Sequence, residues 1–150
     1  MIYRHYKGGL YLMVGYATKF TPDKNVKVEV FEVAKHTETE EMITVLLVHD
    51  KATGGSHYAF DDGKYEGILC FYKDIEGNYW LRPKEMFFEH VVVPVNGNDW
   101  KGFCKRVPRF EKMTGEELFN AISELIDKEL DAVADLLETK MKHSTLLDKS

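Results

Sequence analysis

Alternation between hydrophobic and polar residues dominates the first part of the chain. Residues 26–33 read Val-Lys-Val-Glu-Val-Phe-Glu-Val, and this period of two is typical of a strand with one buried face. Other segments are apolar, aromatic or β-branched and also favour strands: residues 10–16, 42–48, 67–72 and 87–95. Because residues 42–48 are the most uniformly apolar and β-branched, we expect them to form a central strand. The pattern predicts a β-domain over residues 1–113.

Turn residues divide these strands. Glu76-Gly77-Asn78 separates residues 68–73 from residues 79–82, which predicts a hairpin. Residues 50–64 contain several glycines and are expected to form a long, mobile loop. Residues 96–107 are basic and carry Trp100 and Phe103. They could cover a ligand or anchor a partner, or Trp100 could pack on the C-terminal helix.

The period changes after residue 113. Thr114 precedes Glu117 by three residues, which is the capping box of a helix start. Apolar residues then recur at steps of three and four at Phe119, Ile122, Ile126, Leu130, Val133, Leu137 and Met141. We therefore predict one amphipathic helix over residues 114–143, about 40 Å long at 1.5 Å per residue, followed by a disordered tail over residues 144–150. The alternative is a hairpin of two helices folded back on the β-domain.

The predicted helix is long for the β-domain beside it, whose radius of gyration should be roughly 15 Å. Part of its apolar stripe would then extend past the domain, and an exposed apolar stripe of this length calls for a partner. The sequence therefore predicts a homo-oligomer formed through residues 114–143.

Charge is unevenly distributed along the chain. The net charge is −5, and residues 114–150 alone carry four Lys and nine Asp or Glu. Residues 1–113 hold equal numbers of basic and acidic side chains. Because the β-domain is neutral and the helix acidic, nucleic acid is an unfavourable partner.

The chain shows no sign of a membrane or secretory protein. It has no run of eighteen apolar residues, so no membrane span is predicted. The first residues lack the apolar core of a signal peptide, so a cytoplasmic location is expected. The two cysteines, Cys70 and Cys104, are then expected to be free thiols, Cys70 in a buried strand and Cys104 in a basic loop.

Four segments, in order along the chain, resemble a small family of bacterial and phage proteins, the domain of unknown function numbered 1653. They are YRHYKGGLY at residues 3–11, VAKHTET at residues 33–39, YWLRPKEMFFE at residues 79–89 and VPRF at residues 107–110. The resemblance implies a small SH3-like antiparallel β-barrel or roll and no enzyme activity. This chain differs from the family by added residues between Gly15 and Val33, between Val48 and Gly67 and between Val93 and Arg106, and by the C-terminal helix.

The matching segments are rich in cationic and aromatic side chains. The candidate ligand-binding residues are Arg4, His5, Tyr6, Lys7, His36, Trp80, Arg82 and Arg109. Aromatic faces stack on bases, and arginine binds phosphate through two parallel hydrogen bonds. If the fold brings these residues together, they would suit a small anionic, nucleotide-like ligand. Alternatively, the aromatic residues are core, the arginines cap carbonyl groups or pair with Glu38, Glu85 and Glu89, and His36 only braces a turn.

No pattern in the sequence indicates catalysis, a metal or a cofactor. The six histidines lack the spacing of metal ligands; the one pair that could meet is His49-Asp50 with His57. Motifs for nucleophilic serine, for a phosphate-binding loop and for dinucleotide binding are missing from the sequence. We therefore expect a non-enzymatic protein without cofactors.

Three functions remain open. The first is a binding protein that sequesters a small nucleotide-derived ligand, which would suit a phage protein that counters host defence. The second is a protein-interaction or adaptor module that acts through the SH3-like body or the helix. The third, nucleic-acid binding, is disfavoured by charge.

Overall fold

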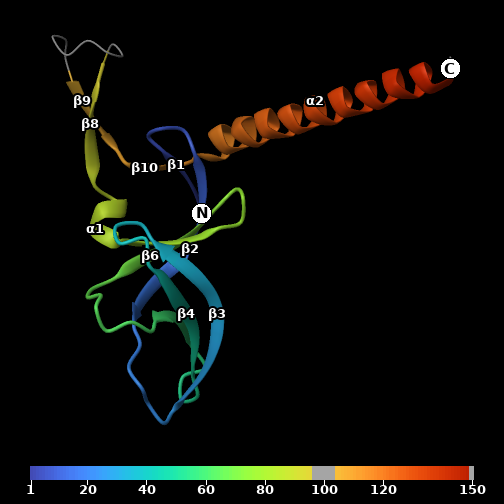
Figure 1. The fold of residues 1–150 in the computed structure, drawn as a ribbon. Coiled ribbons are helices and arrows are strands. Elements are labelled where there is room, and N and C mark those ends of the chain that lie inside the picture. Colours follow the sequence, from blue (N-terminus) through green and yellow to red (C-terminus); the bar gives the residue numbers. More distant parts are fainter. Residues whose placement is uncertain (96–103, 149–150) are drawn as a thin grey trace. The chain divides into compact units, whose positions relative to one another are not determined.

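The computed structural model describes residues 1–95 and 104–148, with side chains described as far as residue 142. The chain divides into two compact units, Met1–Lys112 and Met113–Ser150; the division predicted from the sequence follows residue 113. The first unit is built of strands around a barrel and the second is a long helix, so the fold class is α+β (Figure 1).

The strands of the first unit follow each other with short connections. In the described residues they are β1 (Ile2–His5), β2 (Leu10–Lys19), β3 (Val26–His36), β4 (Met42–Asp50), β5 (Ser56–Phe60), β6 (Leu69–Asp74), β7 (Tyr79–Pro83), β8 (His90–Pro94), β9 (Cys104–Pro108) and β10 (Phe110–Lys112). A short helix, α1 (Lys84–Phe87), lies between β7 and β8.

Six of these strands close into a barrel in the order β2-β5-β4-β3-β7-β6, and pairing of β6 with β2 completes the ring. Most neighbours are antiparallel, as predicted. Two pairs, β2 with β5 and β3 with β7, are parallel, so the barrel is mixed. On one edge, β1 pairs with the start of β2, and β10 pairs with β1. Strands β8 and β9 form a separate two-stranded ribbon.

The barrel interior is filled by apolar side chains from all six of its strands. The fully enclosed cluster consists of Ala17, Ala34, Ile43, Val45, Phe60, Leu69, Phe71 and Leu81. β4 supplies two of them and lies between β3 and β5, as predicted for a central strand. A second cluster of Tyr3, Cys70, Tyr72, Phe87 and Phe110 packs at the edge where β1 and β10 join. Together these clusters hold the strand ends that carry the candidate ligand-binding residues.

Two local predictions are confirmed. The hairpin forms with β6 antiparallel to β7, and Tyr72 lies opposite Trp80 in its register. Its turn is fixed by Asp74, whose carboxylate accepts a hydrogen bond from the backbone N–H of Asn78 at 2.9 Å. Cys70 is buried and Cys104 exposed, and both are free.

Other segments differ from prediction. Residues 50–64 are not one mobile loop: residues 56–60 form β5, with Ala59 and Phe60 fully buried. The expected last strand over residues 87–95 begins later, because Phe87 ends α1 and packs inward. Cys104 lies in β9 rather than in a loop. The part of the predicted basic loop that holds Trp100, Lys101 and Phe103 lies outside the described residues.

The C-terminal unit is one continuous helix, α2 (Gly115–Asp148), and not a hairpin. Its predicted capping box forms: the Thr114 hydroxyl accepts from the Glu117 N–H at 3.3 Å, and the Glu117 carboxylate accepts from the Thr114 N–H at 3.1 Å. The helix extends beyond the predicted end at residue 143. The prediction of a disordered tail was wrong for residues 144–148, which continue the helix.

Candidate functional site

A hollow of about 190 Å³ lies at the edge of the barrel where β1 and β10 meet the β6–β7 hairpin. Its lining residues are His5, Tyr11, Thr37, Tyr72, Trp80, Arg82 and Phe110. They come from six places along the chain, namely β1, β2, the turn after β3, β6, β7 and β10. The barrel therefore gathers at one point side chains that are up to 105 residues apart in sequence, from His5 to Phe110.

Arg82 is the one charged side chain of this lining. Its Nε donates a hydrogen bond to the Thr37 hydroxyl at 3.2 Å, and its guanidinium carbon lies 5.4 Å from the centre of the Phe110 ring. Its Nη1 is buried and has no hydrogen-bond partner among the described residues. A buried guanidinium N–H without an acceptor lowers the stability of the fold. Arg82 therefore lacks one hydrogen-bond acceptor within the part of the chain that the structure describes.

The walls of the hollow are aromatic rings packed edge to face. Tyr11 lies 5.6 Å from Tyr72 and 5.4 Å from Phe110, centre to centre. Phe110 also stacks on Phe87, with ring centres 4.1 Å apart and planes nearly parallel. Such mutually supporting rings leave little freedom for each side chain. The hollow is therefore formed by a rigid part of the second core cluster.

The remaining polar groups of the lining are neutral hydrogen-bond donors or hydroxyls. His5 Nδ1 accepts the backbone N–H of Lys7 at 3.2 Å, which leaves the proton on Nε2. Burial lowers the pKa of His5, and the charges of Arg82, Arg109 and Lys7 lower it further. Burial raises the pKa of Tyr72, against the opposing charge of Arg82. Because no Asp or Glu is among the seven lining residues, the site carries an excess positive charge.

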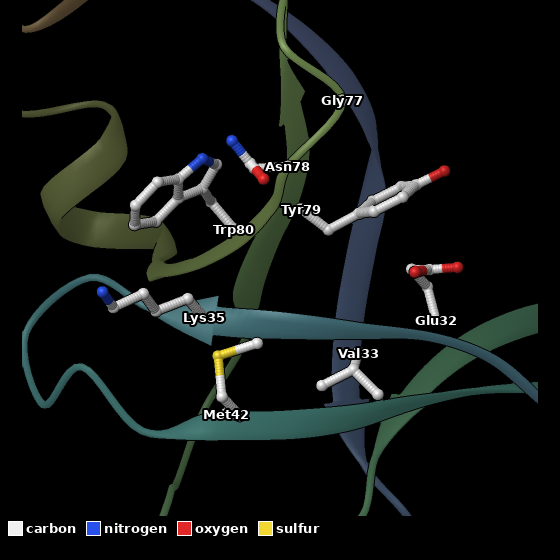
Figure 2. Close-up of a pocket in the computed structure, with 8 residues that line it drawn as sticks. All are labelled: Glu32, Val33, Lys35, Met42, Gly77, Asn78, Tyr79 and Trp80. Carbon is white, nitrogen blue, oxygen red and sulfur yellow. The ribbon is translucent and has the colours of Figure 1, made fainter.

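Trp80 also lines a larger hollow of about 400 Å³. Its indole N–H donates to the Asp74 carboxylate at 2.9 Å, which fixes the ring. Figure 2 shows the second hollow with Trp80 and the Lys35 ammonium group at one end and Tyr79 with Glu32 at the other. Lys35 Nζ lies 5.9 Å from the centre of the Trp80 ring. The second hollow is thus of mixed charge and has an aromatic wall.

A third hollow of about 360 Å³ shares His5 with the first. Its lining residues are Arg4, His5, Tyr6, Val93, Lys105, Val107, Pro108 and Glu111. Its charged residues are two cations, Arg4 and Lys105, and one carboxylate, Glu111. A ligand seated at Arg82 could therefore extend toward further cationic groups on either side.

The structure brings together some of the eight predicted residues and separates others. His5, Trp80 and Arg82 line the hollow at Arg82, and Arg4 and Tyr6 line the third hollow. Lys7 Nζ lies 5.7 Å from the centre of the Tyr6 ring, and the side chain is exposed. Arg109 donates from Nε and Nη2 to the Glu89 carboxylate, one of the pairings weighed from the sequence. Arg109 therefore already has an anionic partner.

His36 has the structural role in a turn that was considered from the sequence as the alternative to ligand binding. It is buried, and its Nδ1 accepts the backbone N–H groups of Glu38 and Thr39 at 3.2 and 3.3 Å. Its ring stacks on Tyr65 with centres 4.4 Å apart. His36 thus braces the β3–β4 turn. It does not line any of the three hollows described above.

Four lining residues were not among the sequence candidates: Tyr11, Thr37, Tyr72 and Phe110. Three of them, Tyr11, Thr37 and Phe110, lie inside the four sequence segments from which the candidates were taken. Tyr72 lies outside those segments, but the hairpin register places it opposite Trp80. Extending the hairpin prediction to cross-strand pairs would have found it.

A second polar constellation lies on β3, β4 and β5. His49 Nδ1 is 2.6 Å from the Ser56 hydroxyl, and its Nε2 is 3.0 Å from a Glu29 carboxylate oxygen. This order of serine, histidine and carboxylate resembles a nucleophile with its base and orienting acid. However, His49 and Glu29 are exposed to solvent, and a nucleophilic site requires donors for the oxyanion and exclusion of water. We regard it as a cross-strand surface network.

The described residues contain no group of three or more His, Cys, Asp or Glu side chains that could hold a metal ion. Within the same residues, no helix combines the length and apolar character needed to cross a membrane. Comparison with protein-family models, with curated proteins and with solved structures gives no match for this chain. The function is therefore inferred from the geometry of the hollow at Arg82.

Proposed function

We propose that this protein binds a small anionic ligand at Arg82, with a planar, nucleotide-like part of the ligand against Trp80, and that it holds the ligand without converting it. One observation carries the proposal: Arg82 is the only charged residue lining a hollow that has no carboxylate of its own, and its Nη1 has no acceptor among the described residues. A phosphate or carboxylate bound in the hollow would pair with the positive charge of the guanidinium group. Charge-assisted hydrogen bonds of this kind are roughly twice as strong as neutral ones.

The size of the hollow limits which ligands can bind in it. Pockets for drug-sized molecules enclose roughly 300–1,000 Å³, and this hollow encloses about 190 Å³. It is large enough for one anionic group or one ring, and not for a whole dinucleotide. A larger ligand would continue into the neighbouring hollows past His5 or Trp80. We therefore expect one phosphate at Arg82 and the rest of the ligand outside.

The resemblance to the domain of unknown function numbered 1653 supports the same site. Each of the four family-like segments supplies at least one of the seven lining residues. Membership of that family is part of this proposal. If it holds, the hollow is the feature that the family and this chain share, and sequestration of a signal nucleotide by a phage protein is a role that suits it.

The proposal is tested by thermal denaturation of the full chain with inorganic phosphate, pyrophosphate, AMP, adenosine and a cyclic dinucleotide. A bound ligand at ten times its dissociation constant stabilises the fold by about 1.4 kcal/mol. We expect AMP to raise the melting temperature more than phosphate, and adenosine to have the smallest effect. Recovery of unchanged nucleotide after incubation would support binding without turnover.

Two variants make the test specific. Arg82→Met removes the cation from the hollow, and Lys84→Met removes a cation that lies two residues away over the Tyr16 ring. The ligand effect should disappear in the first variant and persist in the second. Absence of any shift with every probe, or equal shifts in both variants, would overturn the proposal.

One observation favours the protein-interaction module as a second function. β3 pairs with β4 along its length but with β7 only at Lys35 and His36. In the part of the chain that the structure describes, residues 26–34 of β3 therefore have one unpaired edge, with Val28, Val30 and Val33 exposed. An extended peptide could add a strand there. Residue-specific amide exchange that slows along residues 26–34 with a partner peptide, and not at Arg82, would support it.

A further inference from the structure

The apolar residues of α2 repeat every eleven positions. Phe119, Leu130 and Met141 form one column, and Ile122 with Val133, Leu125 with Leu136, and Ile126 with Leu137 form three more. Eleven residues in three turns give 3.67 residues per turn, close to the 3.6 of a straight helix. Such a stripe runs almost parallel to the helix axis, so two helices could pack along it with little supercoiling.

Most apolar side chains in these columns are exposed to solvent. Phe119 is 71% exposed, Leu130 61% and Leu136 64%. Ile122, Ile126, Val133 and Leu137 are exposed as well. An apolar face of this length in water is unfavourable and marks an interaction surface. The face lies on a helix stabilised at its start by the Thr114 capping box.

The distribution of charge along α2 indicates which partner covers its apolar face. Residues 116–131 hold six acidic side chains and one lysine, whereas residues 132–148 hold three acidic side chains and two lysines. In a parallel pair, the two acidic halves would lie side by side and repel each other. In an antiparallel pair, Lys140 and Lys142 of each copy would lie beside the acidic half that begins at Glu116 of the other.

The spacing of the stripe is compatible with this direction. Its positions are 119, 122, 126, 130, 133, 137 and 141, and they read nearly the same from either end. An antiparallel pair centred at Leu130 therefore places Phe119 beside Met141, Ile122 beside Leu137 and Ile126 beside Val133. Every apolar layer then meets an apolar layer.

We propose that α2 pairs with the α2 of a second copy of this chain, antiparallel and nearly straight, with Leu130 at the two-fold axis. This interface does not depend on the anion site at Arg82. It makes the protein a dimer in which each helix covers the apolar stripe of the other. The occupant is a second copy because the stripe and the charge distribution complement themselves.

The direction of pairing is tested by cysteine cross-linking in the full chain with Cys104→Ser as background, since Cys70 is buried. Ile122→Cys and Leu137→Cys are purified separately, mixed and oxidised. The antiparallel pair predicts a disulfide between the two different variants and none within either alone, because equal positions are then about 22 Å apart at 1.5 Å per residue. Glu124→Cys mixed with Asp135→Cys, on the polar face, should give no cross-link.

Sedimentation equilibrium gives the second readout. The wild type should sediment as a dimer, and Leu130→Asp should weaken dimerisation at least tenfold while Thr139→Asp on the polar face does not. Circular dichroism checks that both variants keep the helix. A monomer at tens of micromolar would overturn the proposal. Cross-links of Ile122→Cys with itself, or a dimer without the mixed disulfide, would overturn the antiparallel arrangement.

Discussion

The guanidinium group of Arg82 lies over the ring of Phe110, with 5.4 Å between its central carbon and the ring centre. Phe110 in turn stacks on Phe87, and Thr37 holds the guanidinium from the side through Nε. The arginine is therefore held by Phe110 and Thr37, while its Nη1 has no acceptor in the described residues. A buried N–H without an acceptor costs stability, which is the expected cost of this arrangement in the absence of a ligand.

Replacement of Arg82 should separate stability from binding. Arg82→Met keeps an unbranched side chain over Phe110 and removes the unpaired N–H groups. We expect the free energy of unfolding without ligand to change by no more than about 1 kcal/mol, because the lost Thr37 bond offsets the relieved desolvation. Urea denaturation with and without pyrophosphate measures both effects. A loss of several kcal/mol without ligand would show that Arg82 serves the fold.

Trp80 should report ligand binding. The chain has two tryptophans, Trp80 and Trp100, so the variant Trp100→Phe leaves Trp80 as the single indole. Because Trp80 lines the hollow beside Arg82, we expect AMP to change its fluorescence in a saturable way, and the change to vanish in the double variant with Arg82→Met. Fluorescence that stays constant while AMP still stabilises the protein would place the ligand away from Trp80.

His36 should make stability depend on pH. Burial lowers the pKa of His36 below its usual value of 6.5, so the unfolded chain takes up protons before the folded one. Its contribution to stability is complete above pH 6.5 and is lost as the pH falls through the window below that value. Protonation of Nδ1 would also break its bonds from the Glu38 and Thr39 N–H groups.

His36→Asn tests this, because an amide oxygen can accept the same N–H groups and does not titrate in this range. The wild type should lose more stability than the variant between pH 7.5 and pH 5. His90→Asn, at an exposed position, serves as control and should follow the wild type. Parallel curves for all three proteins would contradict the prediction.

Glu40 is strained. It is the one non-glycine residue with positive φ in the described backbone, at 62°, and it lies in the turn between β3 and β4. A non-glycine residue in the left-handed region destabilises the fold by roughly 1–2 kcal/mol. Glycine avoids this strain, but its greater conformational entropy in the unfolded chain offsets about half of the gain. Glu40→Gly should therefore raise the free energy of unfolding by about 0.5–1 kcal/mol. Glu38→Gly, in the same turn, should lower it instead.

The Thr114 capping box should determine how firmly α2 begins. Thr114→Ala removes the hydroxyl acceptor of the Glu117 N–H and should destabilise the first turn by about 1 kcal/mol. Amide exchange at residues 116–118 should accelerate as a result. Thr139→Ala, inside the helix, removes only a hydroxyl bond to the Asp135 carbonyl and should not accelerate exchange anywhere, because alanine favours the helix.

Local chemistry explains which elements could be predicted. The hairpin turn at Asp74–Asn78 and the cap at Thr114 depend on residues close in sequence, and both were predicted correctly. The alternating strand at β3 also forms, but the prediction of one buried face was wrong, because residues 27–33 are exposed on both faces. Segment 56–60 was missed because the glycine-rich residues before it and the acidic turn after it resemble a loop. Its strand character comes from pairing on both sides, with β4 and in parallel with β2.

The sequence by itself determined that cationic and aromatic residues recur in four segments and that an amphipathic helix follows them, because composition and period are local properties. Only the tertiary structure decided which cations are available. Arg109 pairs with Glu89, whereas Arg82 lines a hollow without a carboxylate and keeps a buried Nη1 without an acceptor in the described residues. His36 braces its own turn through Nδ1, and its buried Nε2 likewise has no partner among the described residues. For the two arginines this distinction depends on contacts between segments apart in sequence, namely Arg109 with Glu89 and Arg82 with Thr37 and Phe110, which only the tertiary structure brings together.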